Sequence, residues 1–235
     1  MGSTAIILAA GIGKRMQAGK NKQFILLDGK TVLERTLEVF GNNPLVEKIV
    51  LVVKSGEEET CRNLLKAEIA AKTLIVCGGK ERQDSVYNGL KAITWQCDYI
   101  LVHDGARPLV TNEVIERTFK AAQIHGAAVC AVAVKDTIKQ ADESGQVITT
   151  LPRASLWAVQ TPQIFRAQKL ISAYEYAYET GYYGTDDASL LEYAGQKVQI
   201  VMGDYENIKL TTPEDVELAE RILAKRQKGA KEQCE

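Results

Sequence analysis

Residues 5–16 read Ala-Ile-Ile-Leu-Ala-Ala-Gly-Ile-Gly-Lys-Arg-Met, an apolar run that passes into small residues, two glycines and two cations. The apolar run predicts a buried first strand over residues 5–9. Glycines let backbone amides approach a ligand closely, and the cations would neutralise phosphate oxygens. The stretch therefore predicts a nucleotide site at the carboxyl end of the first strand. An ordinary strand-to-helix turn with solvated charges is the alternative.

Two commoner nucleotide-binding loops do not fit this stretch. The dinucleotide fingerprint needs a third glycine three residues after Gly13, where the chain has Met16. The Walker loop needs Ser or Thr directly after Gly-Lys, where the chain has Arg15. The sequence therefore argues against a nicotinamide-type dinucleotide site and against a P-loop.

The composition predicts one globular domain over residues 1–235 and restricts its partners. With 46% apolar residues the chain can bury a sizeable core, and its formal net charge of -1 lacks the basic excess of a nucleic-acid surface. No apolar run approaches the ~18 residues of a membrane span. The five cysteines are an odd number without C-x-x-C spacing, which indicates a reducing compartment, the cytoplasm. We expect Cys77 and Cys130, both in apolar runs, to be buried.

Further apolar runs recur at intervals that leave room for helices between them. Near-continuous apolarity is typical of strands covered on both faces. Thr31 with Glu34 matches a capping box, and Thr212 with Pro213 offers a helix start. The alternation predicts an α/β fold, a Rossmann-like doubly wound and mostly parallel sheet that binds ligands outside the carboxyl ends of its strands. The expected strands are residues 49–53, 73–77, 99–103, 127–134 and 198–202.

Residues 135–153 interrupt this alternation. Two β-capable runs flank a polar turn, Asp-Glu-Ser-Gly at 142–145, which is the pattern of a β-hairpin. The apolar content of the hairpin is too low for a central core position. An ordinary surface hairpin and a projecting arm that meets a partner are equally compatible with it.

Residues 102–108, Val-His-Asp-Gly-Ala-Arg-Pro, end a predicted strand. An aspartate there faces the ligand crevice, and Mg²⁺ usually takes one or two protein carboxylates together with phosphate oxygens. Asp104 is therefore our candidate metal ligand, with a structural ion pair to Arg107 as the alternative. We expect His103 to pack at the strand end, because no second His, Cys or acidic residue has zinc spacing.

Three further segments carry candidate binding groups. Residues 78–86, Gly-Gly-Lys-Glu-Arg-Gln-Asp-Ser-Val, begin with a turn that permits close approach to a planar base, whose edge Ser85 could read. A plain loop with Asp84 capping the next helix is equally compatible. Residues 185–189, Thr-Asp-Asp-Ala-Ser, match a helix N-terminus, where these types are favoured for capping alone. Lys209 lies in an apolar, Thr-rich stretch, which favours a directed role over a solvated one.

In their order along the chain, these blocks resemble one family. Together they are similar to the 2-C-methyl-D-erythritol 4-phosphate cytidylyltransferases of non-mevalonate isoprenoid precursor synthesis, from residue 5 to about residue 220. The related ribitol 5-phosphate cytidylyltransferases share many blocks, and Gly105, often Ala in the family, is a mild departure. The blocks are residues 9–16, 78–86 and 102–108, with Asn-Lys-Gln-Phe at 21–24, Leu-Trp-Ala-Val-Gln-Thr-Pro-Gln at 156–163, Gly-Thr-Asp-Asp-Ala-Ser at 184–189 and Asn-Ile-Lys-Leu-Thr-Thr-Pro-Glu-Asp at 207–215.

The resemblance implies a fold of the nucleotidyltransferase type and an enzyme that joins CTP to a polyol phosphate and releases pyrophosphate. It implies Mg²⁺ or another divalent cation as cofactor, and a homodimer in which the hairpin crosses to the other subunit. The implied roles are charge stabilisation by Arg15, Lys22 and Lys209; CTP binding by Ala10, Gly11, Gly13, Gly78, Gly79, Asp84 and Ser85; substrate binding by Arg107, Thr137, Arg153, Thr161 and Thr185; and metal binding by Asp104.

Other functions stay open at this level. A ribitol 5-phosphate cytidylyltransferase would run the same chemistry on a different polyol. A nucleotide-binding regulatory protein without turnover should lack the set of Arg15, Lys22, Lys209 and Asp104. A dinucleotide oxidoreductase is disfavoured by Met16.

Overall fold

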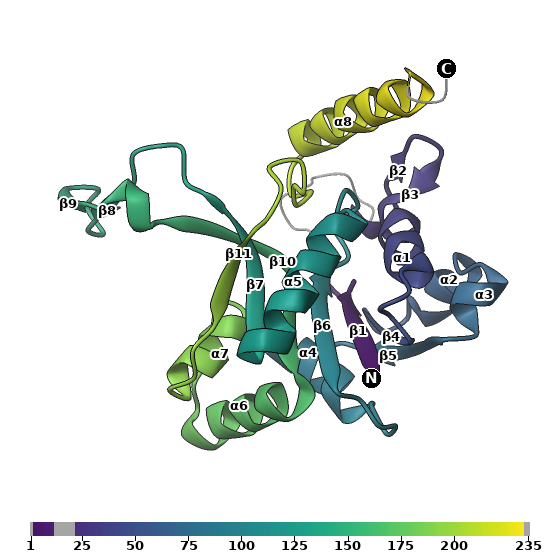
Figure 1. The fold of residues 1–235 in the computed structure, drawn as a ribbon, viewed down its shortest axis with the longest axis horizontal. Helices are drawn as coiled ribbons and strands as arrows, with labels where there is room; N and C mark the ends of the chain where they lie inside the picture. The colour runs from purple at the N-terminus through teal and green to yellow at the C-terminus, as the bar shows by residue number, and fades with distance from the viewer. Residues whose placement is uncertain (1, 12–21, 233–235) are drawn as a thin grey trace.

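The computed structural model, which describes residues 2–11 and 22–232, is built on a seven-stranded sheet (Figure 1). Its strands are β1 (Ser3–Leu8), β4 (Lys48–Val53), β5 (Thr73–Cys77), β6 (Tyr99–Asp104), β7 (Ala127–Ala133), β10 (Trp157–Arg166) and β11 (Gln199–Met202). Their order across the sheet is β11-β7-β10-β6-β1-β4-β5. Neighbours are parallel except where β10 pairs with β6 and β7. The predicted mostly parallel α/β sheet is therefore confirmed.

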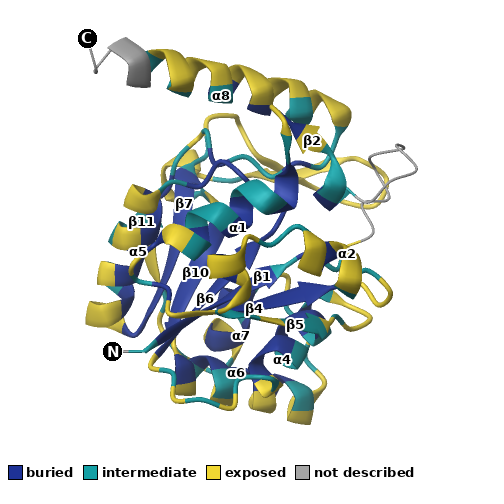
Figure 2. Ribbon diagram, turned by 90° about the vertical axis from the view of Figure 1, so that its right-hand side faces the viewer, coloured by how far each residue is buried: buried dark blue, intermediate teal, exposed yellow. Residues whose placement is uncertain are grey.

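Helices cover both faces of the sheet. One face carries α1 (Val32–Asn42), α2 (Glu58–Asn63), α3 (Ala67–Ala70) and α5 (Asn112–His125), and the other carries α4 (Arg82–Lys91), α6 (Ala167–Thr180) and α7 (Asp187–Tyr193). Successive strand side chains point to opposite faces, so Ile7 packs with the first set and Ile6 with the second. Figure 2 shows buried strands and helices whose outer faces are exposed. Burial on both sides explains why the strands are apolar almost throughout.

Helix α1 begins at the predicted capping box. The Thr31 hydroxyl accepts a hydrogen bond from the Glu34 N–H at 3.2 Å, and the Glu34 carboxylate accepts one from the Thr31 N–H at 2.7 Å. Two backbone donors that the helix leaves unpaired are satisfied in this way. The box follows a short pair of strands, β2 (Leu26–Leu27) and β3 (Lys30–Thr31).

Helix α8 (Pro213–Glu232) begins at the predicted proline. It lies across one end of the molecule (Figure 1). There Ala219 and Ile222 pack on Leu27 and Leu210. This contact holds the segment before α8 over the carboxyl ends of the strands. Among the described residues, none of the helices is both long and apolar enough to cross a bilayer.

Strand β10 was not among the predicted strands. It runs antiparallel between β6 and β7, and its register with β7 shifts between Val159 and Gln163. Polar residues and Pro162 interrupt its apolar pattern, and proline in a run argues against a central strand. The irregular register leaves room for the proline. No local sequence pattern indicates this irregularity.

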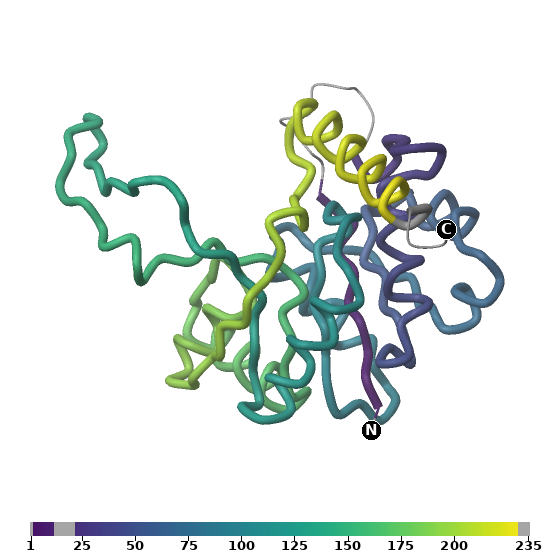
Figure 3. Tube along the Cα trace, turned by 45° about the horizontal axis from the view of Figure 1, so that its top comes forward, coloured from purple at the N-terminus to yellow at the C-terminus, as the bar shows by residue number. Residues whose placement is uncertain are grey.

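The predicted hairpin is present as β8 (Lys139–Ala141) and β9 (Val147–Thr150), an antiparallel pair. Every residue of both strands is exposed. Figures 1 and 3 show that this arm extends away from the body of the molecule. At its turn the Asp142 carboxylate accepts hydrogen bonds from the N–H groups of Ser144 and Gln146 at 2.9 and 3.0 Å. That the arm meets a partner stays a prediction.

The two cysteine predictions have opposite outcomes. Cys130, in the buried strand β7, is fully buried as predicted. Cys77 is exposed, so its predicted burial is wrong. Cys77 ends β5, one of the two edge strands of the seven-stranded sheet, and none of the residues of β5 is fully buried. An apolar run alone does not distinguish an edge strand from a central one.

Candidate active site

A cleft lies at the point of the sheet from which the chain adds strands in both directions. From β1 the chain builds β4 and β5 on one side and then returns to add β6 on the other. Leu8 of β1 is level with Val52 of β4 and with Asp104 of β6, so these strands end together. Ligands of doubly wound sheets bind at such a switch point. The loops after β1, β4, β5 and β6 line a cavity of about 630 Å³.

The cleft brings together eight of the sequence-predicted site residues, from five separate parts of the chain. They are Ala10, Gly11, Lys22, Gly78, Gly79, Ser85, Asp104 and Lys209. Three of these parts are strand ends or the helix that follows one. Lys22 comes instead from the short 3₁₀ turn η2 (Lys22–Phe24), and Lys209 from the segment before α8.

Two glycines allow the loop after β5 to pack closely at the edge of the cleft. A Cβ on Gly78 would lie 2.5 Å from the Ala10 Cβ, and one on Gly79 would overlap Asp84. The Ser85 hydroxyl accepts a hydrogen bond from the Gly79 N–H at 3.0 Å and donates one to the Glu81 carbonyl at 3.0 Å. Ser85 therefore fixes the loop, and the glycines make room for it.

Asp104, at the end of β6, is surrounded by cations. Lys209 Nζ lies 2.8 Å from its Oδ2, Arg107 Nε lies 3.7 Å from the same oxygen, and Arg82 Nε lies 3.7 Å from Oδ1. Burial by itself raises the pKa of the Asp104 carboxyl, but the charges of Arg82, Lys209 and Arg107 outweigh burial and hold that pKa well below its usual range. The side chain of Asp104 is therefore ionised at any working pH. The ion pair with Arg107, which the sequence offered as the alternative role of Asp104, is also present.

A hydrogen-bonded chain behind Asp104 fixes its backbone. The Thr161 hydroxyl accepts from the Asp104 N–H at 3.1 Å and lies 3.0 Å from His103 Nδ1, while His103 Nε2 lies 3.2 Å from the Arg107 carbonyl. A carbonyl only accepts, so Nε2 carries the proton and Nδ1 accepts from Thr161. Burial lowers the pKa of His103 to about 3, and the ring is neutral. His103 packs at the strand end, as predicted.

Hydrogen bonds connect the segment before α8 to the rest of the cleft. Lys22 Nζ donates to the Leu210 carbonyl at 3.2 Å, and Arg107 Nη1 donates to the Asn207 carbonyl at 2.7 Å. The Asn207 side-chain amide donates in turn to the Thr161 carbonyl at 2.9 Å. These contacts place the Lys209 ammonium group beside Asp104.

Several predicted site residues lie elsewhere. Asp84 faces away from the cleft and accepts from the Tyr178 hydroxyl at 2.6 Å, and Thr185 is exposed on the loop before α7. Thr137 and Arg153 are exposed at the base of the arm, where Arg153 Nη1 donates to the Lys135 carbonyl at 2.7 Å. Gly13 and Arg15 lie outside the described residues.

Arg82 and Asp187 are charged groups of the site that the sequence reasoning missed. Arg82 lines the cleft, and its Nη2 donates to Asp187 Oδ2 at 2.7 Å. Arg82 lies in the block at residues 78–86, after the glycine turn, and Asp187 lies in the block at residues 184–189, at a helix start. Their local settings indicated a loop and a cap, and only the contact between them indicates a shared role.

A second cavity, of about 450 Å³, lies between α1 and α8. Its two arginines are already engaged by the protein. Arg35 Nε donates to the Leu27 carbonyl at 2.6 Å, and Arg226 Nε donates to Glu206 at 3.0 Å. The cleft at the switch point is therefore the candidate active site.

The fold and the cleft define the class of this protein. The mostly parallel sheet has glycine loops, lysines and a buried carboxylate at its switch point. These features are those of a nucleotide-binding protein of the nucleotidyltransferase type. The family model for 2-C-methyl-D-erythritol 4-phosphate cytidylyltransferase matches residues 3–225. The chain belongs to this family.

Individual relatives agree with the family model over nearly the whole chain. The enzyme of this name from Alkaliphilus metalliredigens is 48% identical over 234 residues, which are 99% of this chain and 96% of the relative. That from Geobacillus kaustophilus is 51% identical over 96% of this chain and 99% of its own. The crystal structure of 4-diphosphocytidyl-2C-methyl-D-erythritol synthase from Anaerococcus prevotii superposes with a TM-score of 0.84 at 32% identity, covering 95% of this chain and 96% of that one.

Proposed function

We propose that the cleft binds CTP next to 2-C-methyl-D-erythritol 4-phosphate and transfers the cytidylyl group from the first to the second, in isoprenoid precursor synthesis. The observation that carries this proposal is the meeting of Lys22, Lys209 and Asp104 with the glycine loop after β5 in one cleft. Cytidylyl transfer is the activity of the family to which the chain belongs.

In this reaction an oxygen of the substrate phosphate attacks the α-phosphorus of CTP. A new P–O bond forms, the bond from the α-phosphorus to the oxygen bridging to the β-phosphate breaks, and pyrophosphate leaves. A phosphate monoester has a second pKa near ~6, so the attacking oxygen is largely deprotonated at neutral pH without a general base. The barrier lies in bringing two anions together and in the charge on the leaving pyrophosphate. Preorganised cations lower that barrier.

Lys22, Lys209 and Arg15 have separate tasks in this proposal. Lys22 and Arg15 contact the triphosphate and stabilise the charge on the leaving pyrophosphate. Lys209 contacts the α-phosphate or the incoming phosphate. Since its ammonium group lies 2.8 Å from Asp104, Lys209 exchanges that carboxylate for a phosphate oxygen when the substrates bind.

Mg²⁺ or another divalent cation fits Asp104 only together with phosphate oxygens. Within residues 2–11 and 22–232 there is no group of three or more His, Cys, Asp or Glu side chains able to hold a metal alone. Asp104 would provide one carboxylate oxygen, in the way that Mg²⁺ usually combines few carboxylates with phosphates. When bound, the ion would neutralise phosphate charge and act as a Lewis acid.

The remaining contacts distribute the two substrates over the site. Two groups come from the arm, Thr137 and Arg153, and they are exposed in their own chain. We therefore propose a homodimer in which each arm completes the partner's site. CTP is bound by Ala10, Gly11, Gly13, Gly78, Gly79 and Ser85. Asp84 supports this binding from outside the cleft, where it accepts a hydrogen bond from the Glu81 N–H at 2.9 Å. The polyol phosphate is bound by Arg107, Thr137, Arg153, Thr161 and Thr185.

We place this enzyme in the cytoplasm, as one cytidylyltransferase domain over residues 1–235 with the arm inserted at 135–153. The support for the location is the state of the cysteines, because the four that the structure describes are all unpaired. The support for a single domain is the continuous sheet, to which strands from both halves of the chain contribute.

The test is pyrophosphate release from CTP with each candidate phosphate acceptor. We expect release with 2-C-methyl-D-erythritol 4-phosphate, much slower release with ribitol 5-phosphate, and none in the presence of a chelator. Faster turnover of ribitol 5-phosphate would show that the protein has the ribitol 5-phosphate cytidylyltransferase activity instead. Equal turnover with ATP, or full activity with the chelator, would contradict the assigned nucleotide or the metal.

A further inference from the structure

The guanidinium group of Arg82 lies near two carboxylates, through two neighbouring nitrogen atoms. Its Nη2 donates to Asp187 Oδ2 at 2.7 Å, and its Nε lies 3.7 Å from Asp104 Oδ1. The first distance is that of a charge-assisted hydrogen bond, and the second exceeds the range of any hydrogen bond. Asp187 therefore determines where the guanidinium group of Arg82 lies. Asp104 interacts with this group only through the electrostatic field of its positive charge.

The Asp187 carboxylate is itself rigidly held. Asp187 is the first residue of α7 and is fully buried, as is Tyr174 of α6. The Tyr174 hydroxyl donates to Asp187 Oδ1 at 2.6 Å, so both carboxylate oxygens are bonded. Burial raises the pKa of Tyr174 well above its usual value, so the phenol keeps the proton that it donates. Three elements, α4, α6 and α7, thus fix one arginine at the cleft.

Among the described residues, this arrangement leaves one oxygen of Asp104 without a hydrogen-bond partner. Oδ2 is paired with Lys209 at 2.8 Å. Within the described part of the chain, Oδ1 faces only Arg82 Nε, at 3.7 Å. Burying a carboxylate such as Asp187 is unfavourable, and an apolar side chain of similar size often stabilises a core equally well. A buried aspartate at this place is explained if its charge keeps Arg82 from pairing with Asp104.

We propose that Asp187 is a positioning residue for Asp104. It holds the Arg82 guanidinium group on the α7 side of the cleft and so keeps Asp104 Oδ1 available to a divalent cation that enters with CTP. This inference rests on the proposed metal role of Asp104. It adds a group that touches neither substrate but sets the charge balance at the carboxylate that does.

Asp187→Asn removes the charge that attracts Arg82 and keeps the size of the side chain. The guanidinium group would then have Asp104 as its nearest carboxylate partner and would move the short distance into direct contact with Oδ1. A cation would have to displace it. Asp187→Asn should therefore weaken the effect of the metal on nucleotide binding more than nucleotide binding itself.

The measurement is the affinity for CTP by calorimetry, with Mg²⁺ and with a chelator, for each folded variant. The ratio of the two affinities reports the metal alone, because a general loss of structure weakens both equally. We expect Asp187→Asn to lower this ratio at least about fivefold, a typical coupling between contacting groups. Adding Arg82→Gln to Asp187→Asn should restore the ratio, since the competing cation is gone.

The matched control is Asp186→Asn, which removes the neighbouring carboxylate. Asp186 accepts from Gln163 Nε2 at 2.7 Å and from the Ser189 N–H at 2.9 Å, and it makes no described contact with Arg82. Its ratio should equal that of the unmodified protein. An unchanged ratio in Asp187→Asn, or no recovery in the double variant, would overturn the inference.

Two further outcomes separate this inference from the proposed function. If the unmodified protein binds CTP equally well with and without Mg²⁺, the metal role of Asp104 fails, and the inference fails with it. If Asp187→Asn does not fold, Arg82→Gln alone decides. A ratio equal to or above that of the unmodified protein supports the inference. A lower ratio overturns it, because Arg82 itself would then help to hold the metal and nucleotide.

Discussion

Lys22 carries the clearest prediction at the scale of single residues. Its ammonium group reaches the cleft from η2 and donates to the Leu210 carbonyl. Lys22→Ala should lower kcat about 10²–10³-fold, the usual loss on removing one preorganised donor. Stability should change by less than ~1 kcal/mol, because a single partly exposed charge contributes little. The measurements are pyrophosphate release and a denaturant unfolding curve.

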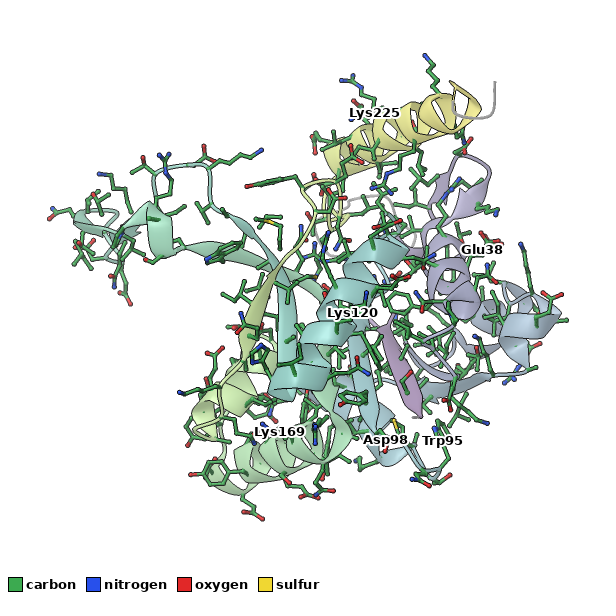
Figure 4. The ribbon with its side chains drawn as sticks, in the orientation of Figure 1. Glu38, Trp95, Asp98, Lys120, Lys169 and Lys225 are labelled. Atoms are coloured by element: carbon green, nitrogen blue, oxygen red, sulfur yellow. The ribbon has the colours of Figure 1, made fainter. Side chains whose placement is uncertain are left out.

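Lys120→Ala is the matched control for this variant. Lys120 is an exposed lysine of α5 and does not line the cleft (Figure 4). Its removal should leave kcat unchanged. Full activity in a folded Lys22→Ala protein would contradict the proposed role of Lys22 in stabilising the leaving pyrophosphate.

His103 predicts a pH dependence of stability. Burial lowers its pKa from 6.5 to about 3. Below pH 6.5 the unfolded chain takes up a proton that the folded chain refuses until about pH 3, so stability is complete above pH 6.5 and falls as the pH is lowered between these values. One such residue contributes a slope of about 1.4 kcal/mol per pH unit. His103→Gln should remove that slope, although the variant is less stable at neutral pH.

Denaturant unfolding from pH 7 to pH 4 measures this slope. His125, the other histidine of the chain, lies exposed at the end of α5. His125→Gln should keep the slope of the unmodified protein. The same slope in His103→Gln would show that the buried ring does not cause the pH dependence.

At the scale of elements, the junction of β5 and α4 depends on glycine. A Cβ on Gly79 would overlap Asp84, so Gly79→Ala has to push the loop away from the first turn of α4. The loop lines the cleft, and overpacking of this kind typically costs ~1–3 kcal/mol. We expect the Kd for CTP to rise about tenfold, measured by calorimetry.

Gly229→Ala provides the comparison for this substitution. Gly229 lies in α8, and its added Cβ would meet nothing within 4 Å. CTP affinity should not change. Equal affinities of Gly79→Ala and the unmodified protein would mean that the loop after β5 does not bind the nucleotide.

The arm determines the prediction for the whole molecule. Val147 and Ile148 are 58% and 61% exposed on a hairpin that extends from the body, and an isolated hairpin is only marginally stable in water. A two-fold dimer would cover two such arms symmetrically. Arg153 would then contact substrate in the partner's site. Mixing inactive Arg153→Ala and Lys22→Ala proteins should restore about a quarter of full activity, since half of randomly formed dimers are mixed and each has one intact site.

The control mixes Lys22→Ala with Lys209→Ala. Both residues line the cleft of their own chain, so every site of a mixed dimer keeps one defect and no activity should return. Confirmed subunit exchange without recovery in the first mixture would refute action of Arg153 across the interface. A fully active monomer would refute it as well.

The sequence by itself determined the class of fold, the strands of the parallel sheet and much of the cleft. Apolar runs bounded by helix signals are local, and the residues that follow each run must lie at the carboxyl edge of a parallel sheet. That rule alone placed Gly11, Gly78 and Asp104 near one another. The order of the blocks along the chain also identified the family, which the match over residues 3–225 confirms.

Only the tertiary structure decided which charges from distant parts of the chain meet. Strand β10 enters the sheet through pairing with β6 and β7, although Pro162 makes its local pattern unlike a strand. Arg82 and Asp187 are 105 positions apart and read separately as a loop residue and a helix start, yet they form one ion pair beside Asp104. Ion pairs of this kind depend on distances between side chains from different elements, and those distances exist only when the helices pack on the sheet.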